Sequence, residues 1–331
     1  MPNASATIES FLSYPARQRV ELAERPATTA PLADEEVAGR TLVTLVSPGT
    51  ELNGLFLADI KEPRQSGYAA IVEIDRVGAG VSDLRPGDRV FCANPHQSRQ
   101  RAKRDAVVPV PHGLRPEIAV FARLMAVGWA SLTITDARPP DRVVVFGLGP
   151  VGNLAAQIFS AAGYQVTAIE PTPGRRDLAR RLGIEDVRPA ADPVDPDRPE
   201  AAQLALECSG HEQAALDATN VLRANGELVL VATPWRKRCD LDAHALLRSI
   251  FHRYIRVRSG WEWQVGPLPS RFAIGSTVDN LAGAMRWLRD GRVRVEGLAT
   301  VAAPADAQRV YDDLMNQRGT PTAVFDWTAL V

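Results

Sequence analysis

The fold is decided by the segment Val143-Val144-Val145-Phe146-Gly147-Leu148-Gly149-Pro150-Val151-Gly152. Its β-branched and aromatic start predicts a buried strand, and the glycines open the helical stretch Val151–Ala162. In such a turn the first glycine permits a tight bend, the second lets the backbone approach a pyrophosphate, and the third allows the helix to pack closely on the strand. Helix-start amides then face the anion. We therefore predict a dinucleotide-binding turn made of Gly147, Leu148, Gly149, Pro150, Val151 and Gly152; an ordinary tight turn is the alternative.

Strands and helices alternate after this turn. Such alternation predicts a doubly wound α/β fold, in which a parallel sheet carries helices on both faces. The expected strands are Val166–Ile169, Leu204–Cys208, Leu228–Val231 and Ile255–Arg258, and the expected helices are Gly174–Leu182, Glu212–Leu222 and Ala243–His252.

The N-terminal part of the chain has a different pattern. Short apolar runs such as Thr41–Val46 and Ala69–Val77 are separated by turn signals, which is typical of a β-rich domain. The C-terminal tail is too small to fold alone, so we expect it to return to this domain. The predicted organisation is a β-rich domain of residues 1–125 and 275–331 around a dinucleotide-binding domain of residues 126–274.

Composition excludes several classes of partner. Lys and Arg total 38 against 39 Asp and Glu, a net charge of −1, so no general attraction to nucleic acid or anionic membrane is expected. No apolar run approaches the ~20 residues of a membrane span, and the first thirty residues show no signal-peptide core. Three cysteines far apart in sequence form no CxxC pair. A cytoplasmic protein is expected.

Further candidates for cofactor contacts lie at strand ends. Glu170 ends the second expected strand, where a carboxylate can accept hydrogen bonds from the adenosine ribose and repel a 2′-phosphate, which favours NAD. Arg175 follows closely and could instead hold that phosphate, so NADP stays open. The carboxyl ends of later strands carry four more candidates, Cys208, Ser209, Ala232 and Thr233.

Four motifs carry a family resemblance: Pro48-Gly49-Thr50-Glu51, the run from Gly78 to Val90 that contains Arg85-Pro86-Gly87-Asp88, the glycine turn, and Leu206 to His211. With these motifs the chain resembles the medium-chain dehydrogenase/reductase superfamily over nearly its whole length. The resemblance implies a β-rich, GroES-like catalytic domain, a Rossmann domain, an active site in the cleft between them, a small-molecule substrate and a homodimer. The Ser47–Glu51 version of the motif is similar to that of bacteriochlorophyllide dehydrogenases, which oxidise a secondary alcohol on a large ring.

The residues that the family uses to bind catalytic zinc are replaced. Where zinc members have a cysteine, Pro48 stands; where they have Gly-His-Glu, the chain reads Gly67-Tyr68-Ala69; and the third ligand falls near Arg123. Zinc needs three or four N, S or O donors held tetrahedrally. We therefore predict that no catalytic metal is bound.

Without a metal, a side-chain O–H or N–H must polarise the reacting oxygen. Thr50 matches the hydroxyl that the family uses as first proton relay, whereas Asn53 replaces the relay histidine. Tyr68 could act as acid or base if its pKa were lowered. His96 lies where the family often places a residue of the substrate cleft. Each has a structural alternative, and Glu51 is expected to be structural. The predicted substrate contacts are Ser47, Asn53, Arg123 and Trp261.

These observations predict a zinc-independent, NAD(P)-dependent oxidoreductase. It would interconvert a secondary alcohol and a ketone on a small or cyclic molecule, with specialised metabolism as one setting. Two alternatives stay open: an NADPH-dependent reductase of an activated C=C bond, as in quinone and enoyl reductases, and a catalytically inactive nucleotide-sensing protein.

Overall fold

The computed structural model describes residues 8–330, and the chain forms two compact units. The first unit contains residues 1–123 and 297–331, and the second contains residues 124–296. The first seven residues of the predicted β-rich domain lie outside the described part. The first boundary lies close to the predicted one, whereas the chain returns to the first unit at Gly297 and not at residue 275.

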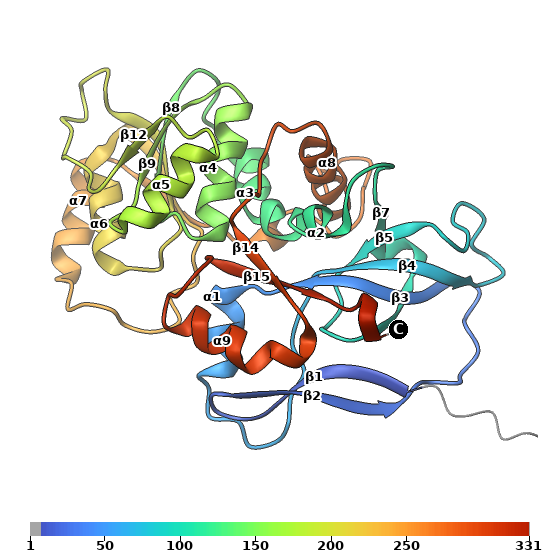
Figure 1. Cartoon of the computed structure of the whole chain (residues 1–331). Helices are drawn as coiled ribbons and strands as arrows, with labels where there is room; N and C mark the ends of the chain where they lie inside the picture. The colour runs from blue at the N-terminus through green and yellow to red at the C-terminus, as the bar shows by residue number, and fades with distance from the viewer. Residues whose placement is uncertain (1–7, 331) are drawn as a thin grey trace, which may run out of the picture. The chain divides into compact units, whose positions relative to one another are not determined.

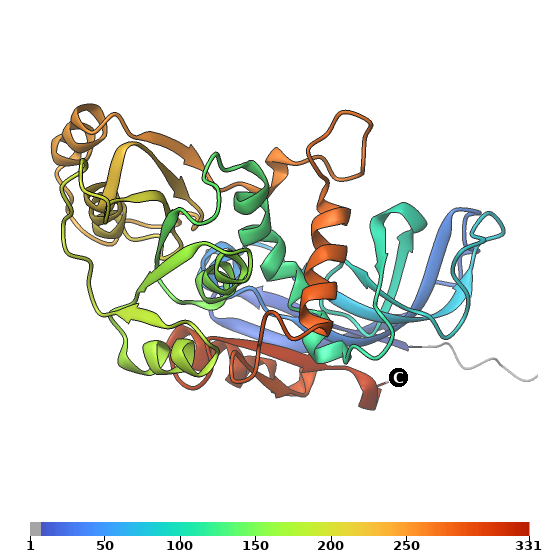
Figure 2. The same ribbon diagram turned by 90° about the horizontal axis from the view of Figure 1, so that it is seen from above.

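The second unit is built on a six-stranded parallel sheet with the strand order β10-β9-β8-β11-β12-β13 (Figures 1 and 2). The order reverses direction after β8, as in the doubly wound folds that bind dinucleotides. The strands are β8 (Arg142–Phe146), β9 (Gln165–Ile169), β10 (Asp186–Arg188), β11 (Ala202–Glu207), β12 (Leu222–Leu230) and β13 (Arg256–Ser259). The helices between them are α4 (Pro150–Ala161), α5 (Pro173–Arg181), α6 (Glu212–Val221) and α7 (Ala243–His252).

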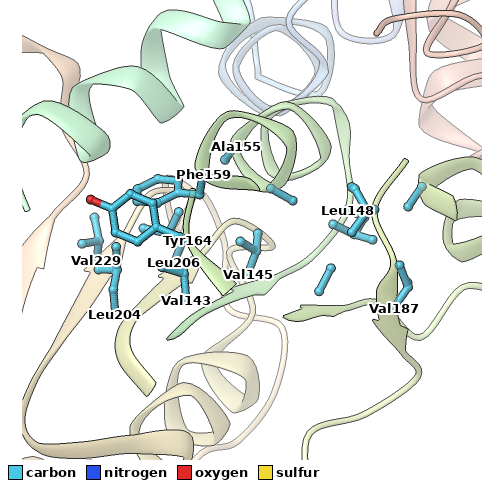
Figure 3. Close-up of a cluster of buried hydrophobic side chains, with 14 of the residues drawn as sticks. Val143, Val145, Leu148, Ala155, Phe159, Tyr164, Val187, Leu204, Leu206 and Val229 are labelled. Carbon is cyan, nitrogen blue, oxygen red and sulfur yellow. The ribbon is translucent and has the colours of Figure 1, made fainter. Parts of the chain in front are cut away.

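Alternate residues of the strands pack into two separate hydrophobic cores, one on each face of the sheet. Val143 and Val145 of β8 pack with Phe159 of α4 on one face (Figure 3), whereas Phe146 packs with Val221 of α6 on the other. Side chains alternate across a strand, so a continuous apolar run such as β8 is buried on both faces. This confirms the doubly wound fold.

The late return of the chain has a packing reason. Helix α8 (Thr277–Arg289) packs on α3 (Ala122–Ile134): the ring centroids of Trp129 and Trp287 are 4.6 Å apart, and a Cβ on Gly283 would lie 3.0 Å from the Trp129 ring. Beyond the helix, the Gln157 amide exchanges hydrogen bonds of 2.8 and 2.9 Å with the backbone of Arg294. These contacts keep residues 277–296 with the second unit.

One apolar segment is longer than the sequence analysis expected. Residues Pro116–Ile134, which form α2 (Pro116–Ala119) and α3, have the length and composition of a membrane span, with a mean hydropathy of 1.5. The expectation that no segment approaches this length is therefore wrong. In the structure 61% of the segment is buried, which is the behaviour of a core helix.

The first unit is a β-rich fold that the C-terminal tail completes. Its main sheet has the order β14-β15-β3-β4-β5-β7, with β6 also paired to β3 and a separate β1-β2 hairpin. Strand β15 pairs antiparallel with β3 through Val324 and Leu45, so the returning tail extends the sheet. The strands are β1 (Ile8–Ala16), β2 (Arg19–Pro26), β3 (Glu36–Leu45), β4 (Ala70–Val77), β5 (Arg89–Cys92), β6 (Arg99–Lys103), β7 (Val107–Pro109), β14 (Ala299–Ala302) and β15 (Thr322–Asp326).

Short helices join these strands. Helix α1 (Pro48–Glu51) continues into the π-helical segment η1 (Leu52–Phe56), and α9 (Ala307–Met315) precedes β15. Tyr311 of α9 packs with Phe56 and Phe325, so the tail also covers the region around α1. The remaining elements are single 3-10 turns: η2 (Arg104–Ala106), η3 (Glu262–Gln264), η4 (Pro304–Asp306) and η5 (Thr328–Leu330).

Candidate active site

The glycine turn after β8 has the backbone geometry that the sequence predicts. Gly147 has a φ of 85°, a conformation that strains any residue with a side chain, and a Cβ on Gly152 would lie 1.9 Å from the Gly147 carbonyl oxygen. By contrast, nothing lies within 4 Å of a Cβ on Gly149, the N-cap of α4. Two glycines shape the turn, and the third leaves open space before the first-turn amides. The turn therefore fits a dinucleotide diphosphate.

The other strand-end candidates lie against this turn. A Cβ on Gly147 would be 2.8 Å from Ser209, and one on Gly152 would be 3.0 Å from Cys208. This closeness follows from the pairing of β8 with β11, because parallel strands end at one edge of their sheet. Gly210, which follows Ser209, packs against Ala232 and Thr233.

A buried carboxylate that the sequence analysis overlooked holds the second of these turns. Glu207 accepts hydrogen bonds from the backbone N–H groups of Ser209 (2.7 Å) and Gly210 (3.0 Å) and from the Ser209 hydroxyl. Burial raises the pKa of Glu207 above its usual value, and the bonds from Ser209 and Gly210 oppose that shift. The Ser209 hydroxyl is thus engaged within the turn.

Glu170, the predicted ribose contact, is deeply buried. It is 2% exposed, and its oxygens accept from the N–H groups of Leu148 (2.8 Å) and Thr172 (2.9 Å). An Arg175 guanidinium nitrogen lies 3.9 Å from the same carboxylate. Glu170 therefore anchors the glycine turn. Each of its carboxylate oxygens has a second lone pair that can accept another hydrogen bond.

In the first unit, several predicted residues meet around Tyr68. The side chains of Ser47 and Thr50 hydrogen-bond its hydroxyl, and the Arg123 guanidinium lies 4.5 Å from the centre of its ring. Ser47 is the N-cap of α1 and is buried, whereas Thr50 on the same helix is exposed. The structure thus brings two predicted catalytic residues and two predicted substrate contacts into one cluster.

The pKa of Tyr68 moves opposite to the expected direction. Burial is the largest cause and the negative charge of Glu51 the second, and together they raise this pKa above its usual 10.0. The hydrogen bonds from Ser47 and Thr50 and the positive charge of Arg123 lower it by less. At neutral pH the phenol keeps its proton, so Tyr68 can donate a proton or a hydrogen bond. Little of the phenolate, the form that acts as a base, is present.

The two remaining predicted substrate contacts are Asn53 and Trp261. The Asn53 amide donates to the Gly49 carbonyl at 2.8 Å, a bond within its own helix. Trp261 belongs to the second unit, where it is 55% exposed and precedes η3.

His96 does not face a cleft, and this prediction is wrong. The ring is 0% exposed, with Nδ1 2.7 Å from the Thr44 hydroxyl and Nε2 2.9 Å from a Glu51 oxygen. A Cβ on Gly67 would lie 2.7 Å from the ring, which shows how closely the backbone covers it. Because the Trp327 indole N–H donates to the Thr44 oxygen at 2.9 Å, the Thr44 proton is available for Nδ1, and Nε2–H faces Glu51.

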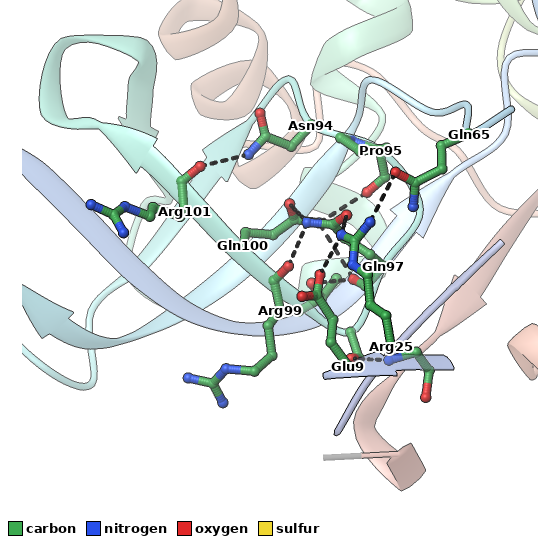
Figure 4. A network of polar contacts seen from close by, with 12 residues as sticks. Glu9, Arg25, Gln65, Asn94, Pro95, Gln97, Arg99, Gln100 and Arg101 are labelled. Atoms are coloured by element: carbon green, nitrogen blue, oxygen red, sulfur yellow. Dashed lines mark hydrogen bonds and ion pairs between the residues drawn. The ribbon is translucent and has the colours of Figure 1, made fainter. Parts of the chain in front are cut away.

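The loop that carries His96 is fixed by its own polar contacts (Figure 4). One Arg25 nitrogen donates to Glu9 at 3.0 Å and to the Gln97 side chain at 2.9 Å, and the Gln100 amide donates to the Pro95 carbonyl at 2.9 Å. Residues on both sides of His96 are therefore anchored, which supports a structural role for the ring.

Glu51 joins this buried histidine to the Tyr68 cluster. The residue is 1% exposed, and its second oxygen accepts a bond of 2.7 Å from the backbone N–H of Ser47. The Tyr311 hydroxyl of α9 donates to the oxygen that also faces His96. Burial and the Glu51 charge raise the pKa of Tyr311 well above its usual value. These contacts support a structural role for Glu51.

The residues present do not fit the family's catalytic zinc. Pro48 and Tyr68 stand where zinc ligands are expected, and the guanidinium of Arg123 places a positive charge beside Tyr68. Within residues 8–330, the single group of three metal-capable side chains is His211, Glu212 and Cys239 in the second unit. A catalytic metal at Tyr68 would lack its donors.

The fold and site together define a class: a Rossmann-type dinucleotide-binding unit joined to a β-rich unit that carries a polar cluster. Comparisons with known proteins agree. Residues 150–261 match the family described as zinc-binding dehydrogenase. An alcohol dehydrogenase from Geobacillus stearothermophilus is 28% identical over 218 residues, which cover 53% of this chain and 62% of that protein. The chain thus spans less than two thirds of this relative.

Solved structures share the fold over nearly the whole chain. Galactitol-1-phosphate dehydrogenase from Escherichia coli has a TM-score of 0.79 at 20% identity and covers 96% of this chain and 99% of its own. Two further structures contain dinucleotides. A zinc-binding dehydrogenase from Sinorhizobium meliloti bound to NADP has a TM-score of 0.76 at 14% identity and covers 97% of this chain and 99% of its own. Acetophenone reductase from Geotrichum candidum with NAD has a TM-score of 0.75 at 16% identity and covers 96% of this chain and 97% of its own. The chain is therefore similar to zinc-type alcohol dehydrogenases in sequence over part of its length and in fold over nearly all of it.

Proposed function

We propose that the protein is an NAD(P)-dependent oxidoreductase that interconverts a secondary alcohol and a ketone without a catalytic metal. The observation that carries this proposal is the protonated Tyr68 phenol, held by Ser47 and Thr50 beside Arg123 where the family has a zinc ligand. The alcohol dehydrogenase among its relatives and the fit of the glycine turn to a diphosphate support the redox class.

The polar cluster suits the proton half of this reaction. The dinucleotide, when bound, supplies or accepts the hydride. During ketone reduction Tyr68 donates its proton to the oxygen as the alkoxide forms. Thr50, which is exposed, returns a proton from solvent to the phenolate. Arg123 stabilises negative charge on both oxygens by its positive charge.

For the cofactor, we propose a preference for NAD over NADP. The negative charge of Glu170 next to the glycine turn disfavours a 2′-phosphate, and the nearby Arg175 is the group that opposes this preference. Fluorescence titration with NADH and NADPH distinguishes the two, and tighter NADPH binding would reject the assignment.

We also propose a substrate class, a location and an oligomeric state. A small or cyclic secondary alcohol is the proposed substrate, and the cytoplasm the proposed location. A homodimer is proposed through the open edge of the parallel sheet. Strand β13 ends that sheet, none of the ten residues of α7 is buried, and Leu247, Phe251 and Val257 are 63%, 76% and 41% exposed.

The decisive test is Tyr68→Phe. If the phenol is the acid, turnover falls about 10²-fold or more while NADH binding is unchanged, because only the hydroxyl is removed. Turnover is followed as NADH absorbance with a panel of ketones and alcohols. Tyr254→Phe is the matched control, since Tyr254 is 70% exposed on the second unit.

The pH profile of the wild-type enzyme checks the same assignment. Because the Tyr68 pKa lies above 10.0, the proton donor is fully present at lower pH and is lost only as the pH rises through the raised pKa. Ketone reduction therefore loses the Tyr68 proton donor only at alkaline pH, higher than for a free tyrosine, and shows no loss attributable to Tyr68 near neutral pH. An unchanged turnover in Tyr68→Phe would return the residue to a packing role, and turnover of enones alone would favour a C=C reductase.

A further inference from the structure

A group of three unlike donor side chains lies in the second unit, beside the turn that contains Ser209. His211 is the N-cap of α6, Glu212 is its first residue, and Cys239 lies in the loop between β12 and α7. Strands β11 and β12 pair in parallel, so the loops that follow them meet at the same edge. One ligand atom from each of the three residues lies within 4.8 Å of the others, and all three are half-buried.

The spacing of two donors already suits a tetrahedral metal site. Cys239 Sγ lies 3.6 Å from Glu212 Oε2. Zinc bonds of about 2.3 Å to sulfur and about 2.0 Å to oxygen at the tetrahedral angle separate the two donors by about 3.5 Å. Thiolate, imidazole and carboxylate are also the donor types that zinc accepts together.

Backbone contacts hold these two donors in place. The Glu212 carboxylate accepts hydrogen bonds from the N–H groups of Arg238 at 3.0 Å and Cys239 at 3.2 Å. Ligating carboxylates in metal sites are usually hydrogen-bonded in this way. Lys237, the ammonium nearest in sequence, is paired with Asp240.

We propose that His211, Glu212 and Cys239 bind one divalent transition-metal ion, with zinc as the favoured ion and water as the fourth ligand. On binding, the Cys239 thiol, which now donates to Glu212, releases its proton to solvent and becomes the thiolate ligand. His211 Nδ1 now accepts from the Gln213 N–H at 3.2 Å, and binding exchanges that cap for a metal bond. The ion joins the start of α6 to the loop before α7. This site takes no part in the proposed hydride transfer.

Cobalt titration of the full-length protein tests the site, because a cobalt–thiolate bond has its own near-ultraviolet charge-transfer band. We expect one equivalent of Co²⁺ per chain to produce that band and Zn²⁺ to displace it. Cys239→Ser removes the band, and His211→Asn, which can still cap the helix, weakens Zn²⁺ binding at least about tenfold. His244→Gln, on the neighbouring helix and exposed, leaves both unchanged.

A second measurement does not depend on variants. Stoichiometric Zn²⁺ should protect Cys239 of the wild-type protein from alkylation, read by peptide mass spectrometry. Absence of the band, a band that persists in Cys239→Ser, or alkylation of Cys239 that Zn²⁺ does not slow would each overturn the proposal. None of these readouts requires turnover, so failure of the metal site and failure of the proposed activity are distinguishable.

Discussion

Glu51 shows how one residue couples the candidate site to the core. Its carboxylate is buried, yet it accepts bonds from Ser47 of the Tyr68 cluster, from His96 and from Tyr311. A buried carboxylate is stable only when its acceptors are used, so these donors hold the loop from Ser47 to Thr50 in place. His96 belongs to this support, which is why a residue predicted to touch substrate proves inaccessible.

Replacing this carboxylate should destabilise the first unit. Glu51→Gln turns one acceptor into an NH₂ group that faces donors, and we expect a loss of about 1–3 kcal/mol in the free energy of unfolding. The measurement is the midpoint of urea unfolding. Glu62→Gln removes the same charge at an exposed position and should leave the midpoint unchanged. Equal midpoints for the two variants would contradict the structural role of Glu51.

At the scale of elements, the strand–turn–helix of β8 and α4 is the part that sequence predicts best. The signal is local. The apolar run of β8 requires burial on both faces of the sheet. Glycine is needed at Gly147 because its φ is positive, and at Gly152 because a side chain would collide with the Gly147 carbonyl. Short strands were harder to predict. Strands β10 and β14, of three and four residues, were not expected, because their pairing with β9 and β15 creates them.

The glycine turn yields a prediction for cofactor binding. Gly152→Ala places a Cβ 1.9 Å from the Gly147 carbonyl, so the turn must shift and its amides lose their alignment. We expect NADH affinity to fall at least about tenfold, a loss of 1.4 kcal/mol, by fluorescence titration. Gly174→Ala is the control, because nothing lies within 4 Å of its Cβ. Wild-type affinity in Gly152→Ala would argue against a diphosphate at this turn.

At the scale of the molecule, the proposed homodimer rests on an open strand edge and on exposed apolar side chains. Among residues 8–330, strand β13 has one hydrogen-bonded neighbour strand, β12, and α7, the helix that precedes β13 in the chain, displays Leu247 and Phe251. Apolar patches of this kind mark interfaces more often than free surface, and a two-fold axis pairs a patch with itself.

Phe251→Lys therefore should disrupt the proposed homodimer. In a two-fold interface each copy carries the added charge, so its effect on the interface counts twice. Light scattering after size exclusion should change from dimer mass to monomer mass. Phe272→Lys, at a 90% exposed position in the loop before α8, should leave the dimer intact. A wild-type chain that elutes as a monomer at micromolar concentration would refute the dimer itself.

The sequence by itself determined the parallel sheet, the glycine turn and the replacement of the zinc ligands, because periodicity, glycine spacing and residue type are local properties. Tertiary structure alone decided where the chain returns to the first unit, since Trp129 and Gln157 hold residues 277–296 through contacts distant in sequence. It also decided the upward shift of the Tyr68 pKa, because burial and the charge of Glu51 cause that shift and only packing brings them together. Packing likewise encloses His96 between Thr44 and Glu51.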